Sequence, residues 1–291
     1  MTPRQLINLH PLMEQTSGRP EVLVGLIDGP VMMPHPALTI NNIRELAGAQ
    51  TGTCTIPNSW ACLHGTFVAG VLSATRESVA PALCPGCTLL LRPIFPEITQ
   101  EHPTMPRTTP DNLAAAIWET VAAGARVINL SLALETHTSQ GHYQLKDALD
   151  FAASRSTIVV SATGNQGTVG GSTLTQHPAV IPVAAYSQQG RPLNLSNIGA
   201  SIGRNGLGAP GEEIVSLGAG NSSHMLTGTS AATPFVTGTI ALLWSLFPAA
   251  TTAQVKMAIT SSTAPGRRTV VPPLLNANTA RTRLQHLVER N

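Results

Sequence analysis

The stretch Val22-Leu-Val-Gly-Leu-Ile-Asp28 is an unbroken apolar run that ends in a carboxylate. Such runs are typical of strands that are buried on both faces of a parallel sheet. Similar runs predict further strands at Thr88–Arg92, Arg126–Leu132, Thr157–Ala162 and Val180–Ala185.

Helical patterns separate these strands, at Asn112–Ala123, Leu145–Ala153, Ala231–Leu246 and Thr252–Ser261. Alternation of strands and helices predicts an α/β fold with right-handed crossovers. We expect a three-layer, doubly wound and mostly parallel sheet with helices on both faces. In such sheets, ligands bind beyond the carboxyl ends of the strands, which is where Asp28 and Asn165 lie.

The composition excludes several classes of protein. Hydrophobic residues make up 42% of the 291 residues and charged residues 11%, against a usual value of about 25%. A chain of this kind is not disordered, and its net charge of +2 is too small to favour nucleic-acid binding. Aromatic residues are 3%, so the core is predicted to consist of aliphatic side chains.

We divide the chain into an N-terminal extension with a short helix (1–21), a catalytic domain (22–265) and a basic C-terminal tail or helix (266–291). The basic residues from Lys256 onward are interpreted as a solvated surface, with docking of an acidic peptide as the alternative. The first residues lack the apolar run of a signal peptide, and no segment is apolar over about 18 residues. We therefore expect a cytoplasmic protein without a membrane partner.

The four cysteines, Cys54, Cys62, Cys84 and Cys87, leave three alternatives open. The spacing of Cys84-Pro-Gly-Cys87 fits a metal knuckle or a redox pair. A four-cysteine zinc site fits poorly, because Cys54 and Cys62 are separated by seven residues. Two local disulfides are a second alternative, and free thiols, the usual state in a reducing cytosol, are the third.

Three segments carry the side chains of nucleophilic catalysis. Asp28 follows a strand, His64 precedes an expected helix start rich in small residues, and Ser230 begins a buried helix. Each alone has an ordinary structural explanation: a turn, a core histidine and a helix cap. Together they supply a carboxylate, an imidazole and a hydroxyl, in the order Asp, His, Ser.

The chain resembles the subtilisin-like serine proteases, or subtilases, over about residues 20–262. Six segments carry the resemblance in order: Val24–Pro30, His64–Thr66, Asn129–Ser131, Ala162–Asn165, Ala209–Gly211 and Gly228–Pro234. The resemblance implies that Ser230 is the nucleophile, His64 its base and Asp28 the group that orients the imidazole. It also implies that Asn165 donates to the oxyanion, a contact whose loss costs about 10² to 10³ in rate.

The resemblance also implies where a substrate binds. An extended peptide is expected to pair with Ser131, Leu132 and Ala133 by β-augmentation. The residues Thr163, Gly164 and Gln166 are expected to help line the first pocket, although all six positions are equally well read as ordinary strand and loop residues. The family has Gly where Ala133 stands, and a hydroxyl residue where Gly29 stands.

Within the family, the nearest resemblance is to the leader-cleaving proteases of cyanobactin pathways. It rests on Leu26–Val31, His35-Pro36, Pro93–Phe95, Ser196–Ala200 and Ala209–Glu213. We therefore expect a serine endopeptidase that cleaves a ribosomally made precursor peptide. The alternatives are a broad degradative subtilase, a transpeptidating macrocyclase and an inactive peptide-binding relative.

Two further expectations follow from lengths and counts. Only 36 positions separate Asp28 from His64, which leaves little room for a helical insertion that would shield an acyl-enzyme from water. The 27 residues before Asp28 cannot hold the long pro-region of secreted subtilases. We expect no cofactor and no catalytic metal; Asp and Glu total 15, without an acidic loop cluster that would support a structural calcium site.

Overall fold

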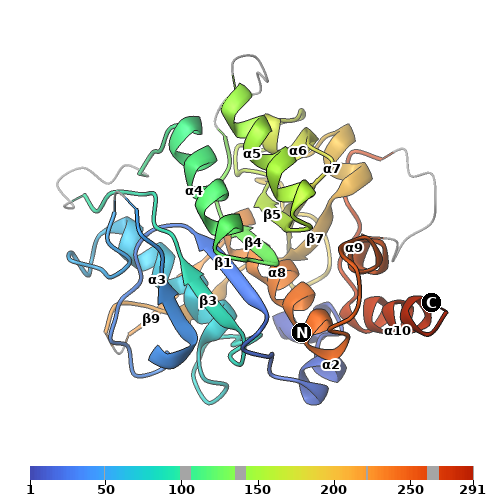
Figure 1. The fold of residues 1–291 in the computed structure, drawn as a ribbon, viewed down its shortest axis with the longest axis horizontal. Coiled ribbons are helices and arrows are strands. Elements are labelled where there is room, and N and C mark those ends of the chain that lie inside the picture. Colours follow the sequence, from blue (N-terminus) through green and yellow to red (C-terminus); the bar gives the residue numbers. More distant parts are fainter. Residues whose placement is uncertain (49, 99–105, 135–141, 221, 261–268, 291) are drawn as a thin grey trace.

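A seven-stranded sheet, parallel throughout, forms the centre of the molecule in the computed structural model (Figure 1). The structure describes residues 1–48, 50–98, 106–134, 142–220, 222–260 and 269–290. The strand order is β2-β3-β1-β4-β5-β6-β7. In chain order, the strands are β1 (Leu23–Ile27), β2 (Ile43–Glu45), β3 (Thr88–Leu91), β4 (Val127–Leu130), β5 (Ile158–Ala162), β6 (Val180–Tyr186) and β7 (Leu207–Pro210).

Helices cover both faces of this sheet, so the predicted three-layer α/β fold is confirmed (Figure 1). The helices are α1 (Pro3–Leu6), α2 (His10–Gln15), α3 (Trp60–Ser73), α4 (Pro110–Ala122), α5 (Tyr143–Ser154), α6 (Thr173–Gln176), α7 (Ala200–Asn205), α8 (Thr229–Leu246), α9 (Thr252–Thr260) and α10 (Ala277–Glu289). A 3-10 turn, η1 (Ile40–Asn42), and an antiparallel hairpin of β8 (Ile214–Leu217) and β9 (Ser223–Leu226) complete the described elements.

The apolar runs of the sequence arise because the central strands contribute side chains to two separate hydrophobic cores. Leu26 and Val127 pack with α3 and α8 on one face, whereas their neighbours Ile27 and Ile128 pack with α4 and α5 on the other. Successive side chains of a strand point to opposite faces, so a sheet covered on both faces needs apolar residues at every position.

The order of the strands places a crevice at the carboxyl ends of β1 and β4. The chain leaves β1 toward β2 and β3 on one side, and it leaves β4 toward β5, β6 and β7 on the other. Ligands of open α/β sheets bind at such a switch point, because the two diverging connections leave space between them.

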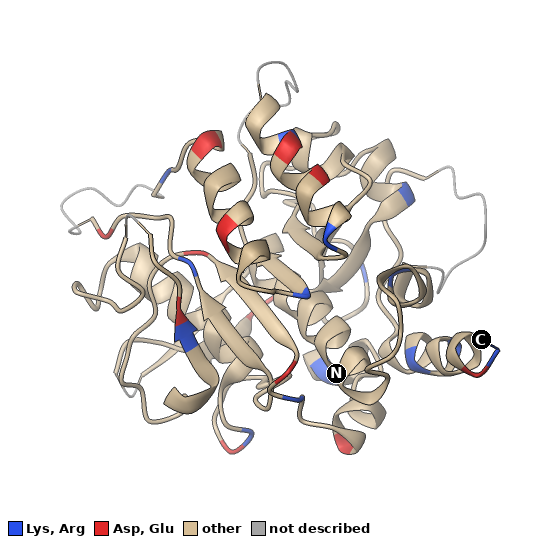
Figure 2. Cartoon of the chain, in the orientation of Figure 1, with Lys and Arg blue, Asp and Glu red and all other residues tan. Residues whose placement is uncertain are grey.

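Both ends of the chain pack onto this domain. Ile7, Leu9 and Leu12 are fully buried in the core that contains α8, so the N-terminal segment packs on the domain through these side chains. The basic C-terminal segment forms α10, which packs against α9 and α2 and carries basic side chains near the C-terminus (Figure 2). No helix among the described residues is long and apolar enough to cross a bilayer.

Candidate active site

Small residues bring α3 unusually close to the end of β1. A Cβ atom added at Gly29 would lie 2.1 Å from the carbonyl oxygen of Ala61, and one at Gly65 would lie 2.4 Å from that of Pro30. Real Cβ atoms do not approach carbonyl oxygens so closely, so only glycine fits at both positions. The hydroxyl residue that the family has at position 29 is therefore excluded here, and the close contact sets His64 beside Asp28.

Asp28 and His64 form a buried hydrogen-bonded pair. Oδ1 of Asp28 lies 2.7 Å from Nδ1 of His64 and accepts a second hydrogen bond, also 2.7 Å, from the backbone N–H of Gly29. A carboxylate can only accept hydrogen bonds, so Nδ1 carries the proton and Nε2 is left as the basic nitrogen. Nε2 has no hydrogen-bond partner among the described residues. The backbone N–H of Gly29 thus supports the carboxylate without a neighbouring hydroxyl group.

The helix that carries His64 begins earlier than the sequence pattern indicated. His64 was expected just before a helix start, but it lies inside α3, which begins at Trp60 and is capped by Ser59. The Ser59 hydroxyl accepts a hydrogen bond from the backbone N–H of Cys62. Nearly every residue of α3 is buried, so no polar face marked its first turn.

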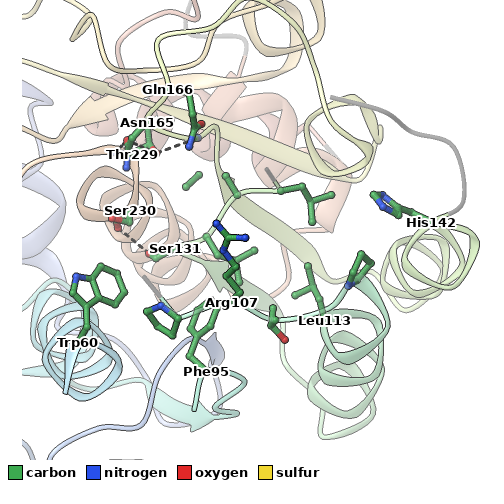
Figure 3. Close-up of a pocket in the computed structure, with 18 residues that line it drawn as sticks. Trp60, Phe95, Arg107, Leu113, Ser131, His142, Asn165, Gln166, Thr229 and Ser230 are labelled. Carbon is green, nitrogen blue, oxygen red and sulfur yellow. Dashed lines mark hydrogen bonds between the residues drawn. The ribbon is translucent and has the colours of Figure 1, made fainter. Parts of the chain in front are cut away.

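Ser230 occupies the first turn of α8, where backbone N–H groups lack helical acceptors. Gly228 before it has a φ of 150°, a conformation that side chains disfavour. Pro234 has no N–H to donate to the carbonyl of Ser230, and this carbonyl instead accepts a 2.8 Å hydrogen bond from the Ser131 hydroxyl. The contact joins the start of α8 to the segment that follows β4 (Figure 3).

The side-chain amide of Asn165 is held in one orientation by Thr229. Oδ1 of Asn165 accepts hydrogen bonds from the backbone N–H and the hydroxyl of Thr229, at 2.9 and 3.0 Å. Because N–H groups need an oxygen acceptor, these contacts fix which amide atom is Oδ1. The N–H groups of Nδ2 therefore make no hydrogen bond to Thr229, and Asn165 lines the cavity described next.

A cavity of about 440 Å³ collects most of the predicted site residues (Figure 3). Its lining includes Ser230, Asn165, Ser131, Leu132, Ala133, Gly164 and Gln166, together with Trp60, Phe95, Arg107, Leu113 and His142, which were not predicted. Asp28 and His64 are not among the lining residues. Trp60, which lines the cavity, stacks on His64 and so connects the Asp28–His64 pair to it.

Thr163 is the predicted pocket residue that does not line this cavity. Its side chain is buried, whereas Ala162 and Gly164 on either side of it do line the cavity. Thr163 was expected to help line the first pocket, and it stays outside the lining of this cavity. The loop beyond it is held by Asn197, whose side chain bonds to the carbonyl of Thr163 and to Oε1 of Gln166.

The loop before α3 is held by a disulfide and by a carboxylate. Cys54 is bonded to Cys62. Glu97 accepts hydrogen bonds from the backbone N–H and hydroxyl of Thr55, the N–H of Ile56 and the hydroxyl of Ser59. Burial alone would raise the pKa of Glu97, but these hydrogen bonds outweigh it and lower the pKa. Both restraints act on the residues that lead into the first turn of α3.

The cysteines divide into one disulfide and two thiols, a mixture that none of the three sequence alternatives contained. Cys84 and Cys87 are free and buried. Their mutual hydrogen bond, with burial, raises the pKa of Cys84 well above its ordinary value, and the same bond lowers that of Cys87. A four-cysteine zinc site is not formed, because the sulfurs of Cys54 and Cys62 are consumed by their own bond.

Thiol titration will check this assignment. In denaturant without reductant, we expect two reactive thiols per chain, and four after reduction. The double variant Cys54→Ser with Cys62→Ser serves as control and should show two thiols under both conditions. Four thiols in the unreduced protein would contradict the disulfide.

The comparison with known families decides what kind of protein this is. A profile of the Subtilase family matches residues 19–287. The chain belongs to the subtilase family. Among curated proteins, this subtilase is 34% identical over 188 residues to the Thermophilic serine proteinase of Bacillus sp. (strain AK1). That match covers 62% of this chain and 42% of the other, and the chain spans about half the length of the first curated relatives.

Solved structures extend the similarity to nearly the whole subtilase. A mutant of the protease domain of PatA superposes with a TM-score of 0.84 and 30% identity, covering 92% of this chain and 97% of that chain. The Prenylagaramide maturation protease PagA superposes with a TM-score of 0.81 and 28% identity, covering 95% and 98%. The resemblance to subtilases inferred from the sequence is thereby confirmed.

Proposed function

We propose that this subtilase is a serine endopeptidase in which Asp28, His64 and Ser230 form the catalytic triad. The observation that carries the proposal is the buried Asp28–His64 pair, whose basic Nε2 has no partner among the described residues. Family membership and the position of Ser230 on the adjoining cavity support it.

The proposed reaction begins when the Ser230 hydroxyl attacks the carbonyl carbon of a peptide bond. Nε2 of His64 accepts the hydroxyl proton, and the Asp28 carboxylate stabilises the imidazolium that forms. The oxyanion would accept hydrogen bonds from Nδ2 of Asn165 and from the backbone N–H of Ser230. His64 then gives its proton to the leaving amine, and a water molecule hydrolyses the acyl-enzyme by the same steps.

We further propose that the substrate is a precursor peptide rather than proteins in general. PatA and PagA are named as patellamide and prenylagaramide maturation proteases, and both superpose on more than nine tenths of this chain. The substrate would lie along Ser131, Leu132 and Ala133, which line the cavity beyond the end of β4. Hydrolysis is favoured over macrocyclisation, because the described residues between Asp28 and Ser59 form a 3-10 turn and a short strand but no α-helix.

A phosphonate probe tests the triad. We expect one adduct per chain by intact mass in the wild-type protein and none in Ser230→Ala. The matched control is Ser154→Ala, which removes an exposed hydroxyl on α5 and should label as the wild type does. Absence of an adduct on the wild type, or an adduct on Ser230→Ala, would reject the proposal.

A mixed peptide library then tests the substrate class. A maturation protease should cleave a small set of related sequences, whereas a degradative enzyme should cleave many unrelated ones. The second outcome would leave the triad in place and remove the precursor-peptide role.

A further inference from the structure

The indole of Trp60 lies flat on the imidazole of His64. The ring centroids are 4.5 Å apart and the ring planes differ by 15°. Trp60 and His64 are four residues apart on α3, so both side chains project from the same face of the helix, one turn apart. Trp60 also lines the cavity beside Ser230 (Figure 3).

The first turn of α3 holds the indole in this position. Ser59 caps the helix immediately before Trp60, and Cys62 two residues after it is tied by the disulfide to Cys54. Glu97 also accepts a hydrogen bond from the hydroxyl of Ser59. Because the backbone on both sides of Trp60 is already restrained, its side chain loses little further conformational entropy when it stacks on His64.

We propose that Trp60 is a positioning residue for His64, one that fixes the plane of the imidazole and stabilises its protonated form. This inference rests on the proposed function. A cation over the face of a tryptophan ring is attracted by the ring quadrupole, and tryptophan is the strongest of the aromatic side chains in this respect. During the proposed reaction, His64 becomes an imidazolium when it accepts the Ser230 proton, so the contact strengthens in that step.

Besides the indole of Trp60, two titratable groups among the described residues act on His64. Asp28, at the end of β1, binds Nδ1, and His224 approaches from β9, where its ring packs edge-on against Phe67. Burial, followed by the nearby charge of His64, lowers the pKa of His224. The lowered pKa favours the neutral form of His224, so this ring adds no attraction for a charged His64. Because His64 is 2% exposed, water supplies little of the stabilisation, and Asp28 and the indole face remain.

The first test needs no enzymatic activity. The titration midpoint of His64 is measured by NMR in the Ser230→Ala background, with and without Trp60→Leu. The His64 signal is assigned by its loss in His64→Asn. Leucine keeps the imidazole covered but offers no π face, so the midpoint should fall by about 0.5 to 1 pH unit. Trp60→Phe should give a smaller fall. The matched control is Trp118→Leu, which removes an indole stacked on Phe151 outside the cavity and should leave the midpoint unchanged. An unchanged or higher midpoint in Trp60→Leu would overturn the proposal.

The second test is the pH profile of kcat/KM with Ser230 intact. In Trp60→Leu, the acid limb should move to lower pH by the same amount, and the plateau should fall about 3- to 10-fold. If KM rises and the acid limb does not move, Trp60 contacts the substrate without acting on His64, and the proposal is overturned. If the wild-type protein neither labels nor cleaves, the proposed function fails, and the NMR titration still decides the role of Trp60.

Discussion

Replacement of Ser230 by alanine is expected to lower kcat by about 10⁴- to 10⁶-fold. The methyl group cannot attack a carbonyl, and the remaining rate comes from binding and oxyanion stabilisation alone. The substitution removes one oxygen at the partly buried first turn of α8. The Ser230 carbonyl that accepts from Ser131 is kept, so the fold should be unaffected.

Steady-state kinetics on a cleaved peptide will measure this loss, with thermal unfolding as the check on folding. Ser245→Ala is the matched control, because it makes the same chemical change on the same helix, where the hydroxyl bonds to the carbonyl of Ala241. It should keep near wild-type kcat. Full activity in Ser230→Ala would remove the triad assignment.

Replacement of Asp28 by asparagine is expected to lower kcat by about 10⁴-fold. A neutral amide cannot stabilise the imidazolium that His64 becomes. An amide N–H turned toward Nδ1 would also move the ring proton to Nε2, which then could not act as a base. The low exposure of both side chains makes the loss of charge more costly than it would be in water.

Asp150→Asn provides an internal comparison for this variant. Asp150 also binds a histidine, since Nε2 of His177 lies 3.0 Å from its Oδ1, but neither residue lines the cavity. The kcat of this variant should stay within about twofold of the wild type. Equal losses in the two variants would mean that Asp28 acts through stability and not through His64.

The sheet was predictable where burial on both faces left an unmistakable pattern. Strands β1, β4, β5 and β6 lie within one or two residues of their predicted bounds, because each carries apolar side chains for two cores. β2 was missed, since it is a three-residue edge strand with exposed Arg44 and Glu45. The β8–β9 hairpin was missed because each strand has only four residues and no residue of β9 is buried.

The sequence predicted the residue types of the candidate site, but not the contacts that hold their side chains in place. Asp28, His64, Asn165 and Ser230 stood in recognisable motifs. The structure pairs Asp28 with His64 and puts Asn165 and Ser230 on the cavity that Trp60, stacked on His64, also lines. The contact that orients Asn165 and the stacking of Trp60 depend on side-chain geometry across distant segments. The spacing of four residues between Trp60 and His64 was the one local signal that could have indicated the stacked pair.

The crevice is assembled from the end of β1, the body of α3, the loop after β5 and the start of α8. About 200 residues lie between Asp28 and Ser230, and ribosomes add about 5 to 20 residues per second. Ser230, the proposed nucleophile, is therefore made some 10 to 40 s after Asp28, the proposed carboxylate of the triad. Until α8 has emerged and packed on the strands, the growing chain lacks one member of the proposed triad. Under the proposed function, the capacity to cut peptides is therefore a property of the folded chain and not of any one segment.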